Sequence, residues 1–187
     1  MHGDEAPSPW VQRWAHLLPA GARVLDVACG RGRHVRWLAA RGCAVTAIDR
    51  DADALSGLQG VAELITADIE AGPWPCAGRT FDAVLVTNYL WRPLWPLLLD
   101  AVAPGGWLLY ETFAHGHQTV GRPARPAFLL EAGELLRVCQ GLRIVAYEDG
   151  FLPAPERFVQ RVVAVREEAG ASAPPRYPLS SPPAPPG

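Results

Sequence analysis

The chain has 187 residues, of which 49% are hydrophobic and 19% are charged, a balance that suits one domain with one buried core. Its net charge is −2, so no overall positive field draws it to nucleic acid or to an anionic membrane. All 17 basic residues are arginine, which excludes the lysine of a phosphate-binding loop and a Schiff-base lysine.

Helical and strand patterns alternate from residue 8 to residue 165. Ser8 and Pro9 open an amphipathic helix, and we assign residues 1–20 to an N-terminal capping helix. Buried strands are then expected at 23–28, 43–48, 62–67, 81–87, 107–113, 142–147 and 157–165. Further helices are expected at 33–41, 52–58, 94–102 and 127–139. In the last of these helices, the buried face should consist of Leu129, Leu130, Leu135 and Leu136.

This alternation predicts an α/β fold, a doubly wound and mostly parallel seven-stranded sheet covered on both faces. No helical pattern separates the last two strands, so they should pair antiparallel. Residues 169–187 are rich in proline, alanine and serine, and we expect a disordered tail there. In sheets of this kind, ligands bind beyond the carboxyl ends of the strands.

The cysteines and the start of the chain bear on compartment. Cys29, Cys43, Cys76 and Cys139 are irregularly spaced, which is typical of reduced thiols and not of a disulfide framework or a zinc site. The first nine residues contain no apolar signal segment, and no apolar run approaches the ~20 residues of a membrane span. We expect a cytoplasmic protein, monomeric or homodimeric, with no metal and no membrane partner.

The strongest motif is VLDVACGRGRH, which begins at Val24. Gly30 and Gly32 let the backbone approach a ligand and turn into a helix. A dinucleotide-binding fingerprint would place glycine or alanine three residues after Gly32, where this chain has Val35. Asp26, before the glycines, suits a ligand that carries an ammonium group and is poorly placed against a pyrophosphate.

Two further strand ends carry carboxylates. Asp49 ends the second strand and can accept hydrogen bonds from both ribose hydroxyls, while Asp51 is the better candidate for the N-cap of the next helix. Asp68 ends the third strand, where its side chain can accept an adenine amino hydrogen while Ile69 covers the ring. Either aspartate could instead serve only as a local cap.

Five segments in order, VLDVACGRGRH, AIDRD, ADIE, FDAVLVTNYLW and APGGWLLYETF, resemble the motifs of class I S-adenosylmethionine-dependent methyltransferases. The resemblance runs from about residue 22 to residue 165. Within the superfamily, the chain most resembles small bacterial stand-alone enzymes such as the tellurite-resistance methyltransferase group, and this narrower resemblance is the weaker of the two. The broader resemblance implies a Rossmann-like methyltransferase domain at residues 21–168, in which the last strand is antiparallel. It also implies S-adenosylmethionine as the cofactor and S-adenosylhomocysteine as the product.

By position, the resemblance implies cofactor contacts for Asp26, Ala28, Gly30, Gly32, Asp49, Arg50, Asp68, Ile69, Asn88, Tyr89, Trp10 and Arg13. The first four would hold the methionyl part, and the next four the ribose and the adenine. Asn88 and Tyr89 would lie beside the methyl group. Trp10 and Arg13 would close over the cofactor, although Trp10 is equally explained as core packing.

Methyl transfer from a sulfonium is an in-line displacement, so a general base is needed only when the nucleophile carries a proton. Glu111 at the end of the fifth strand, His115 and Tyr89 are the candidate catalytic residues. His115 and His117 could act as a base or a metal ligand, or could merely touch solvent. His34 lies either beside the methionyl group or at the surface.

The acceptor is expected to be a small molecule. The segment Thr87–Trp91 lacks the paired prolines of many amino-group methyltransferases of nucleic acids, and only short segments, 1–18 and 114–127, can cap the site. A thiol or another chalcogen fits this picture, because a thiolate, a selenide or a tellurium oxyanion carries no proton on the attacking atom and needs no base. The alternatives are an NAD(P)-dependent oxidoreductase, a non-catalytic cofactor-binding module and an RNA methyltransferase.

Overall fold

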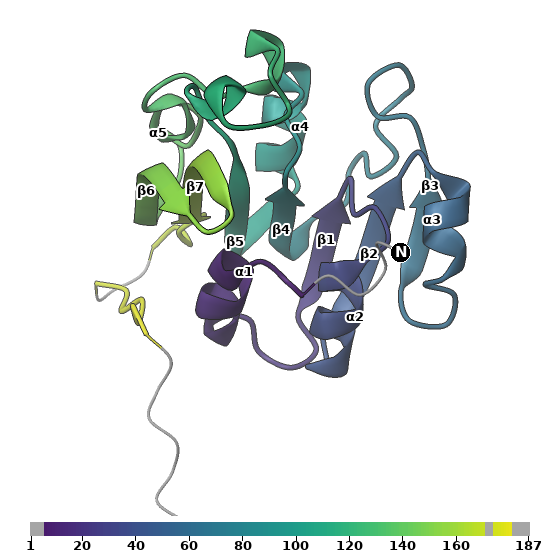
Figure 1. Cartoon of the computed structure of the whole chain (residues 1–187). Helices are drawn as coiled ribbons and strands as arrows, with labels where there is room; N and C mark the ends of the chain where they lie inside the picture. The colour runs from purple at the N-terminus through teal and green to yellow at the C-terminus, as the bar shows by residue number, and fades with distance from the viewer. Residues whose placement is uncertain (1–5, 171–173, 181–187) are drawn as a thin grey trace, which may run out of the picture.

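A computed structural model describes residues 6–170 and 174–180, and its centre is one seven-stranded sheet (Figure 1). The strands lie in the order β3-β2-β1-β4-β5-β7-β6. Their bounds are β1 Arg23–Val27, β2 Ala44–Asp49, β3 Glu63–Thr66, β4 Phe81–Thr87, β5 Val102–Phe113, β6 Arg143–Pro153 and β7 Glu156–Val165. β7 pairs antiparallel with both β5 and β6, while the first five strands run parallel. The predicted fold class is therefore confirmed.

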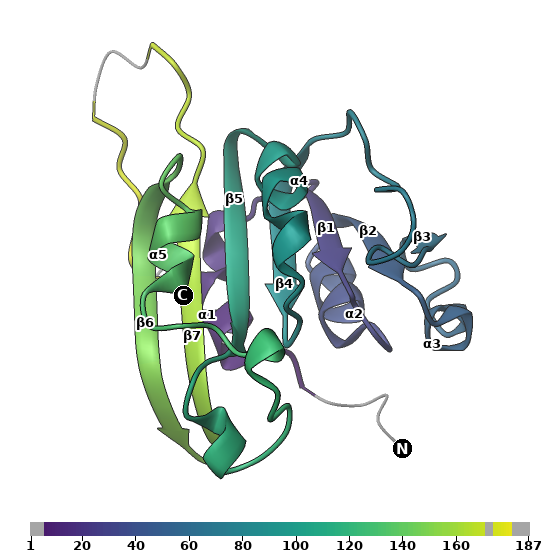
Figure 2. The ribbon, with the colours of Figure 1, turned by 90° about the horizontal axis from the view of Figure 1, so that it is seen from above.

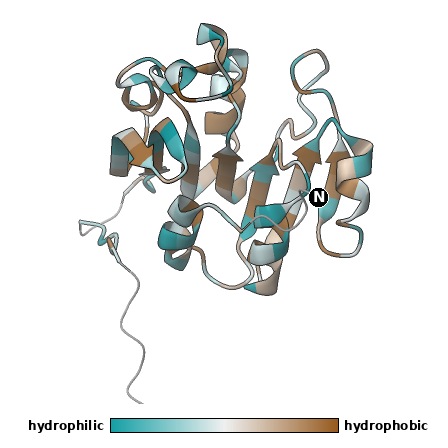
Figure 3. Cartoon of the chain, viewed as in Figure 1, coloured by the Kyte–Doolittle hydropathy of each residue, from teal (hydrophilic) through white to brown (hydrophobic). Residues whose placement is uncertain are grey.

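Helices cover both faces of the sheet, as Figure 2 shows for α1 and α2 on one face and α4 and α5 on the other. The α-helices are α1 Pro9–Trp14, α2 Arg33–Ala40, α3 Ala52–Ser56, α4 Trp95–Asp100 and α5 Glu134–Val138. Four 3₁₀ turns are η1 Ala15–Leu17, η2 Arg92–Leu94, η3 His117–Thr119 and η4 Pro126–Phe128. Alternate strand residues enter two separate apolar clusters, one under α1 to α3 and one under α4 and α5. The hydropathy colouring of Figure 3 follows this layering, with the apolar residues concentrated on the central strands.

The helices α2 and α3 each begin at an N-cap residue whose backbone or side chain suits the start of a helix. Gly32 caps α2 with a φ of 75°, and a Cβ at this position would lie 2.5 Å from the Leu58 side chain. Glycine therefore meets both the backbone and the packing requirement there. α3 begins at Asp51, whose side chain accepts from the backbone N–H groups of Asp53 and Ala54. The prediction that Asp51 caps this helix is confirmed.

The prediction of a single helix at 127–139 is wrong. After the turn η4, Leu129 and Leu130 are extended, and Leu130 forms a parallel bridge with Ala114. Only five residues after Gly133, which has a φ of 67°, form the helix α5. Leu129, Leu130 and Leu135 are buried as expected, whereas Leu136 is 38% exposed.

Arg92 explains why this segment is not one helix. Its guanidinium donates to the carbonyl oxygens of Ala127 and Leu129 and forms two hydrogen bonds with Glu134. These carbonyls are consequently taken up by a side chain and not by helical N–H groups.

Two other boundaries differ from the sequence prediction. β5 begins at Val102 and not at 107, because Val102 already pairs with Phe81 of β4; the register then shifts before Trp107 pairs with Ala83, and Gly105 in between has a φ of 75°. β6 continues to Pro153, beyond the predicted end at 147, and pairs with β7 along its whole length.

The described part of the proline-rich tail, residues 174–180, contacts the domain. The Tyr177 ring packs edge-on against Trp107, with ring centroids 5.3 Å apart. His16 Nε2 lies 3.0 Å from the carbonyl oxygen of Pro178. The prediction of disorder for 171–173 and 181–187 concerns residues outside the described ranges. Among the described residues, no helix is both long and apolar enough to cross a bilayer.

Candidate functional site

Three adjoining cavities follow the carboxyl ends of the strands. The first, about 370 Å³, is lined by Ala28, Asp49, Arg50, Ala67, Asp68, Ile69, Glu70, Tyr89 and Phe128. The second, about 300 Å³, is lined by Ala28, Cys29, Gly30, Arg31, Arg33, His34, Thr87 and Asn88. The third, about 240 Å³, is lined by Glu70, Asn88, Tyr89, Leu90, Thr112, Phe113, Pro123 and Phe128. Shared wall residues join all three cavities, so they form one elongated site at the edge where this fold binds ligands.

A larger hollow of about 750 Å³ lies at the opposite, amino-terminal edge of the sheet. Its lining residues include an exposed ion pair, Arg79 with Glu63, and none of the residues predicted for the site. Its position, away from the carboxyl ends of the strands, makes it the weaker candidate in spite of its size.

The loop after β1 brings bare backbone to the second cavity. Ala28 and Gly30 have φ values of 54° and 56°, and a Cβ added to Gly30 would meet no atom within 4 Å. Asn88, after β4, has a φ of 55°. A left-handed conformation costs alanine about 1 kcal/mol or more, and such strain collects at functional sites. The two strained residues both line the cavities, as expected for a ligand site.

Asp49 fixes the geometry between the β1 loop and β2. One carboxylate oxygen accepts from the Gly30 backbone N–H at 2.7 Å, and the other from the Asp51 backbone N–H at 2.9 Å. Each oxygen retains a lone pair that can accept from a hydroxyl in the first cavity.

The adenine-side residues predicted from the sequence lie together in the first cavity. Arg50, Asp68 and Ile69 all line it. Asp68 Oδ1 also accepts from the backbone N–H groups of Glu70 and Ala71, so this oxygen orders the turn after β3. The Asp68 side chain therefore acts as a local cap and can still contact a ligand in the first cavity.

Asp26 lies beneath the glycine loop and not in the wall of any of the three cavities. It is 1% exposed, and its Oδ2 atom has no hydrogen-bond partner among the described residues. Burial raises the pKa of its carboxyl group to about 8; the Arg33 charge opposes this shift and the Asp49 charge adds to it. This placement argues against direct contact between Asp26 and a ligand in the three cavities.

The Asp26 carboxyl should make the stability of the folded chain depend on pH. Its stabilising contribution is fully present below about pH 4 and is lost as the pH rises to about 8, because the folded chain keeps a proton that the unfolded chain releases. Asp26→Asn removes this dependence. From about pH 5 to about pH 8, wild type should therefore lose at least about 1 kcal/mol of unfolding free energy relative to the variant, measured in urea. A difference that does not change with pH would contradict the buried neutral acid.

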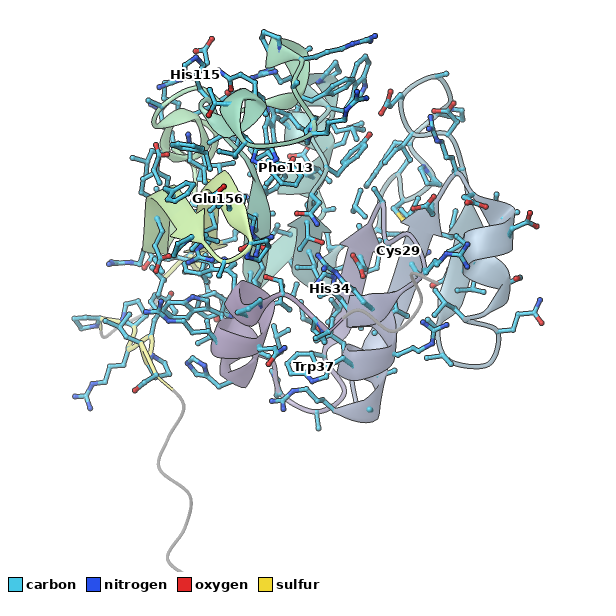
Figure 4. The ribbon with its side chains drawn as sticks, in the orientation of Figure 1. Cys29, His34, Trp37, Phe113, His115 and Glu156 are labelled. Carbon is cyan, nitrogen blue, oxygen red and sulfur yellow. The ribbon has the colours of Figure 1, made fainter. Side chains whose placement is uncertain are left out.

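His34 lines the second cavity as a neutral imidazole. Its Nε2 atom accepts from the Ser8 backbone N–H at 3.1 Å, and its Nδ1 atom lies 3.5 Å from Thr87 Oγ1. Burial, with a smaller effect of the Arg33 charge, lowers the pKa of His34 to about 3. Figure 4 shows His34 in the interior, close to the start of α2. Of the two readings left open by the sequence, the structure supports the one beside the proposed methionyl group.

Tyr89 lines both the first and the third cavity. Its hydroxyl donates to Glu70 Oε1 at 3.2 Å, and its carbonyl oxygen accepts from the Tyr110 hydroxyl at 2.7 Å. Burial, followed by the charge of Glu70, raises the pKa of the Tyr89 phenol well above its ordinary value. Tyr89 thus remains a hydrogen-bond donor and is unsuited to act as a base.

Glu111 lies away from the three cavities, in a buried network. It is fully buried, and its two oxygens accept from Ser8 Oγ at 2.7 Å and from Arg161 at 3.2 Å. Arg161 also binds Glu148 and lies over the Trp10 ring. In place of the predicted base, the structure gives Glu111 a role in attaching the start of α1 to the sheet.

The two predicted lid residues of α1 belong to the same network. Trp10 is 2% exposed, and Arg13 pairs with Glu148 at 2.9 Å. Neither lines any of the three cavities. The core-packing reading of Trp10 is the one that its burial supports.

The two histidines of the loop after β5 do not enter the cavities either. His115 is exposed, and Figure 4 places it at the upper edge of the molecule, apart from His34 and Cys29. His117 is buried, with its ring stacked on Phe113 and its Nε2 atom 3.0 Å from the Arg122 carbonyl oxygen. Across the described ranges, no group of three histidine, cysteine, aspartate or glutamate residues could hold a metal ion.

Sequence reasoning missed two residues of the third cavity, Glu70 and Phe128. The other lining residues, among them Tyr89 and Phe113, lie in segments that end or follow the fourth and fifth strands and that the sequence had singled out. Glu70 stands two residues after Asp68, so the third strand end carried the signal for it. Phe128 carried no such signal, because it fell within a segment predicted to be helical.

Comparisons with known proteins agree with this geometry. Residues 24–106 match a family described as "Methyltransferase domain". A ubiquinone biosynthesis O-methyltransferase of Burkholderia multivorans is 36% identical over 118 residues, 55% of this chain and 48% of that protein. A ribosomal RNA small subunit methyltransferase C of Chromohalobacter salexigens is 55% identical over 137 residues, 73% of this chain and 34% of that protein. The chain thus spans half or less of the length of these relatives.

Solved structures match over most of the chain. TehB from Haemophilus influenzae has a TM-score of 0.69 at 20% identity, with 89% of this chain and 63% of that chain covered. A SAM-dependent methyltransferase from Methanosarcina mazei has a TM-score of 0.67 at 15% identity, with 88% and 100% covered. At these identities, the solved structures establish the shared fold.

Proposed function

We propose that this chain, whose residues 24–106 match the methyltransferase-domain family, transfers a methyl group from S-adenosylmethionine to a small-molecule acceptor. The family match supports the predicted resemblance to class I methyltransferases and S-adenosylmethionine as the cofactor, and the solved structures share the fold. We assign the methyl transfer to the domain predicted at residues 21–168.

The observation that carries the proposal is the row of three joined cavities. The first cavity suits adenosine, with Asp49 accepting from the ribose hydroxyls and Arg50, Asp68 and Ile69 around the base. The second offers the open backbone of Ala28 and Gly30 to the methionyl chain. The third then lies beyond the methyl group, across Asn88, which lines both the second and third cavities.

This row of cavities supports catalysis by alignment. The sulfonium donor is already activated, so a protein that holds acceptor and methyl group in line supplies most of what the reaction needs. The third cavity, at about 240 Å³, has room for a small molecule. Segment 114–130 limits its size, because Pro123 and Phe128 form part of its wall.

The first test is calorimetric titration of nucleotide-free protein with S-adenosylmethionine and, in parallel, with NADH. S-Adenosylmethionine should bind with a dissociation constant on the order of 10 µM, and NADH should not bind. Binding of NADH, or of neither ligand, would overturn the proposal. Methyl transfer is then measured with thiols and other chalcogens, the class predicted from the sequence, and with amines.

RNA is the second candidate acceptor, because one curated relative carries the name of a ribosomal RNA methyltransferase and matches 73% of this chain. The expectation that nucleic acid is excluded has no support from that comparison. Small-subunit ribosomal RNA should therefore be tested among the acceptors. Methylation of this RNA would contradict the proposal of a small-molecule acceptor.

A further inference from the structure

The lining residues of the third cavity carry one negative charge and no positive charge. Its wall includes one carboxylate, Glu70, and three aromatic rings, those of Tyr89, Phe113 and Phe128. Leu90 and Pro123 add apolar surface. Such a combination attracts a cation, because the carboxylate supplies negative charge and aromatic faces stabilise ammonium groups by about 0.5–2 kcal/mol each.

Glu70 is held where it can use this charge. Its Oε1 atom accepts from the Tyr89 hydroxyl at 3.2 Å, while its backbone N–H donates to Asp68 Oδ1 at 3.0 Å. Tyr89 is fixed in turn, because the Tyr110 hydroxyl donates to its carbonyl oxygen. The Glu70 Oε2 atom is therefore directed by a supported side chain and can accept a further hydrogen bond.

The lining residues of the third cavity include no arginine. Arg50 shares the first cavity with Glu70 and Tyr89 but does not line the third. Arg122 and Arg125, on the segment that covers the site, are exposed and line none of the three cavities. No ion pair joins Glu70 to an arginine among the described residues.

We propose that the acceptor is a small amine with an apolar body, which enters the third cavity as an ammonium ion and is held there by the Glu70 carboxylate. This inference rests on the proposed methyl transfer. It narrows the acceptor away from the anionic chalcogens, since an oxyanion in the third cavity would face the Glu70 carboxylate and no arginine among the lining residues.

The transfer balances without a further reagent. The bound ammonium loses one proton to water through the Glu70 carboxylate, which frees the nitrogen lone pair. That lone pair forms the new N–C bond to the methyl group. The C–S bond breaks, its electron pair stays on sulfur, and S-adenosylhomocysteine leaves as the neutral thioether.

Binding in the third cavity can be measured without turnover. The protein is saturated with S-adenosylhomocysteine and titrated with three probes of similar size, namely phenethylamine, 2-phenylethanol and phenylacetate. Phenethylamine should bind at least about tenfold more tightly than phenylacetate, because only the cation complements Glu70. In Glu70→Gln, again saturated with S-adenosylhomocysteine, phenethylamine binding should weaken about tenfold, while binding of 2-phenylethanol stays unchanged.

Glu131→Gln is the matched control, because Glu131 is a highly exposed carboxylate that lines none of the three cavities. It should bind all three probes as wild type does. Equal or tighter binding of phenylacetate, or an equal effect of the two variants, would overturn the amine inference while S-adenosylhomocysteine binding upholds the proposed function. Failure of the cofactor itself to bind would overturn both.

Discussion

Asp49→Ala should weaken the binding of S-adenosylmethionine at least about 100-fold, the largest effect expected of any single change in the site. A carboxylate that accepts from two ribose hydroxyls contributes about 1.5–3 kcal/mol for each bond. The substitution also frees the Gly30 backbone N–H, which Asp49 binds at 2.7 Å, so the loop beside the second cavity loses its support. Calorimetric titration with the cofactor measures both effects together.

Asp51→Ala is the control, since it removes the same charge two residues away. Asp51 caps α3 and lines none of the three cavities, so its loss should cost about 1 kcal/mol of stability and leave cofactor affinity within about twofold. Asp49→Asn, which retains one acceptor oxygen, should give an intermediate affinity. If Asp49→Ala bound the cofactor as wild type does, the ribose assignment would be refuted.

Glu111→Ala should lower the free energy of unfolding by about 3–5 kcal/mol. Its carboxylate is fully buried and binds both Ser8 and Arg161, whose side chain is itself only 14% exposed. Truncation leaves a buried hydroxyl without its acceptor and removes one of the two carboxylates that balance Arg161. Urea unfolding followed by tryptophan fluorescence measures the loss.

Glu148→Ala tests the same guanidinium from its exposed side. Glu148 is 40% exposed, so its removal should cost no more than about 1 kcal/mol. The catalytic alternative for Glu111 makes a different prediction. If Glu111→Gln retained wild-type stability and cofactor affinity but lost methyl transfer, Glu111 would be a catalytic residue and the structural assignment would be wrong.

The sequence located the edge of the sheet at which ligands bind but could not tell which face each side chain takes. Successive residues of β5 point to opposite faces. Glu111 shares the face of Leu109, which packs in the cluster under α1, so it points away from the cavities. Thr112, one residue later, reaches the third cavity. Proximity to a strand end was therefore predictable for Glu111, whereas its partners depended on where α1 packs.

The acceptor end was less predictable for a different reason. The apolar spacing of Leu129, Leu130 and Leu135 fits one helix, yet the structure buries the same three side chains with Leu129 and Leu130 extended and Leu135 in α5. Burial alone does not distinguish these two conformations. The choice depends on Arg92, which lies over thirty residues earlier and occupies the carbonyl groups of the segment. By contrast, the proposed cofactor end was predictable because Gly30, Asp49 and Asp68 each lie at the end of a strand or within three residues after it.

Phe128 lines both the first and the third cavity, as do Glu70 and Tyr89, so the two cavities share a wall. Any displacement of the Phe128 ring by one ligand changes the surface offered to the other. Thermodynamic linkage then requires reciprocity: donor binding alters acceptor affinity by the same factor as acceptor binding alters donor affinity. Coupling of this kind would arise within one domain, without a second subunit.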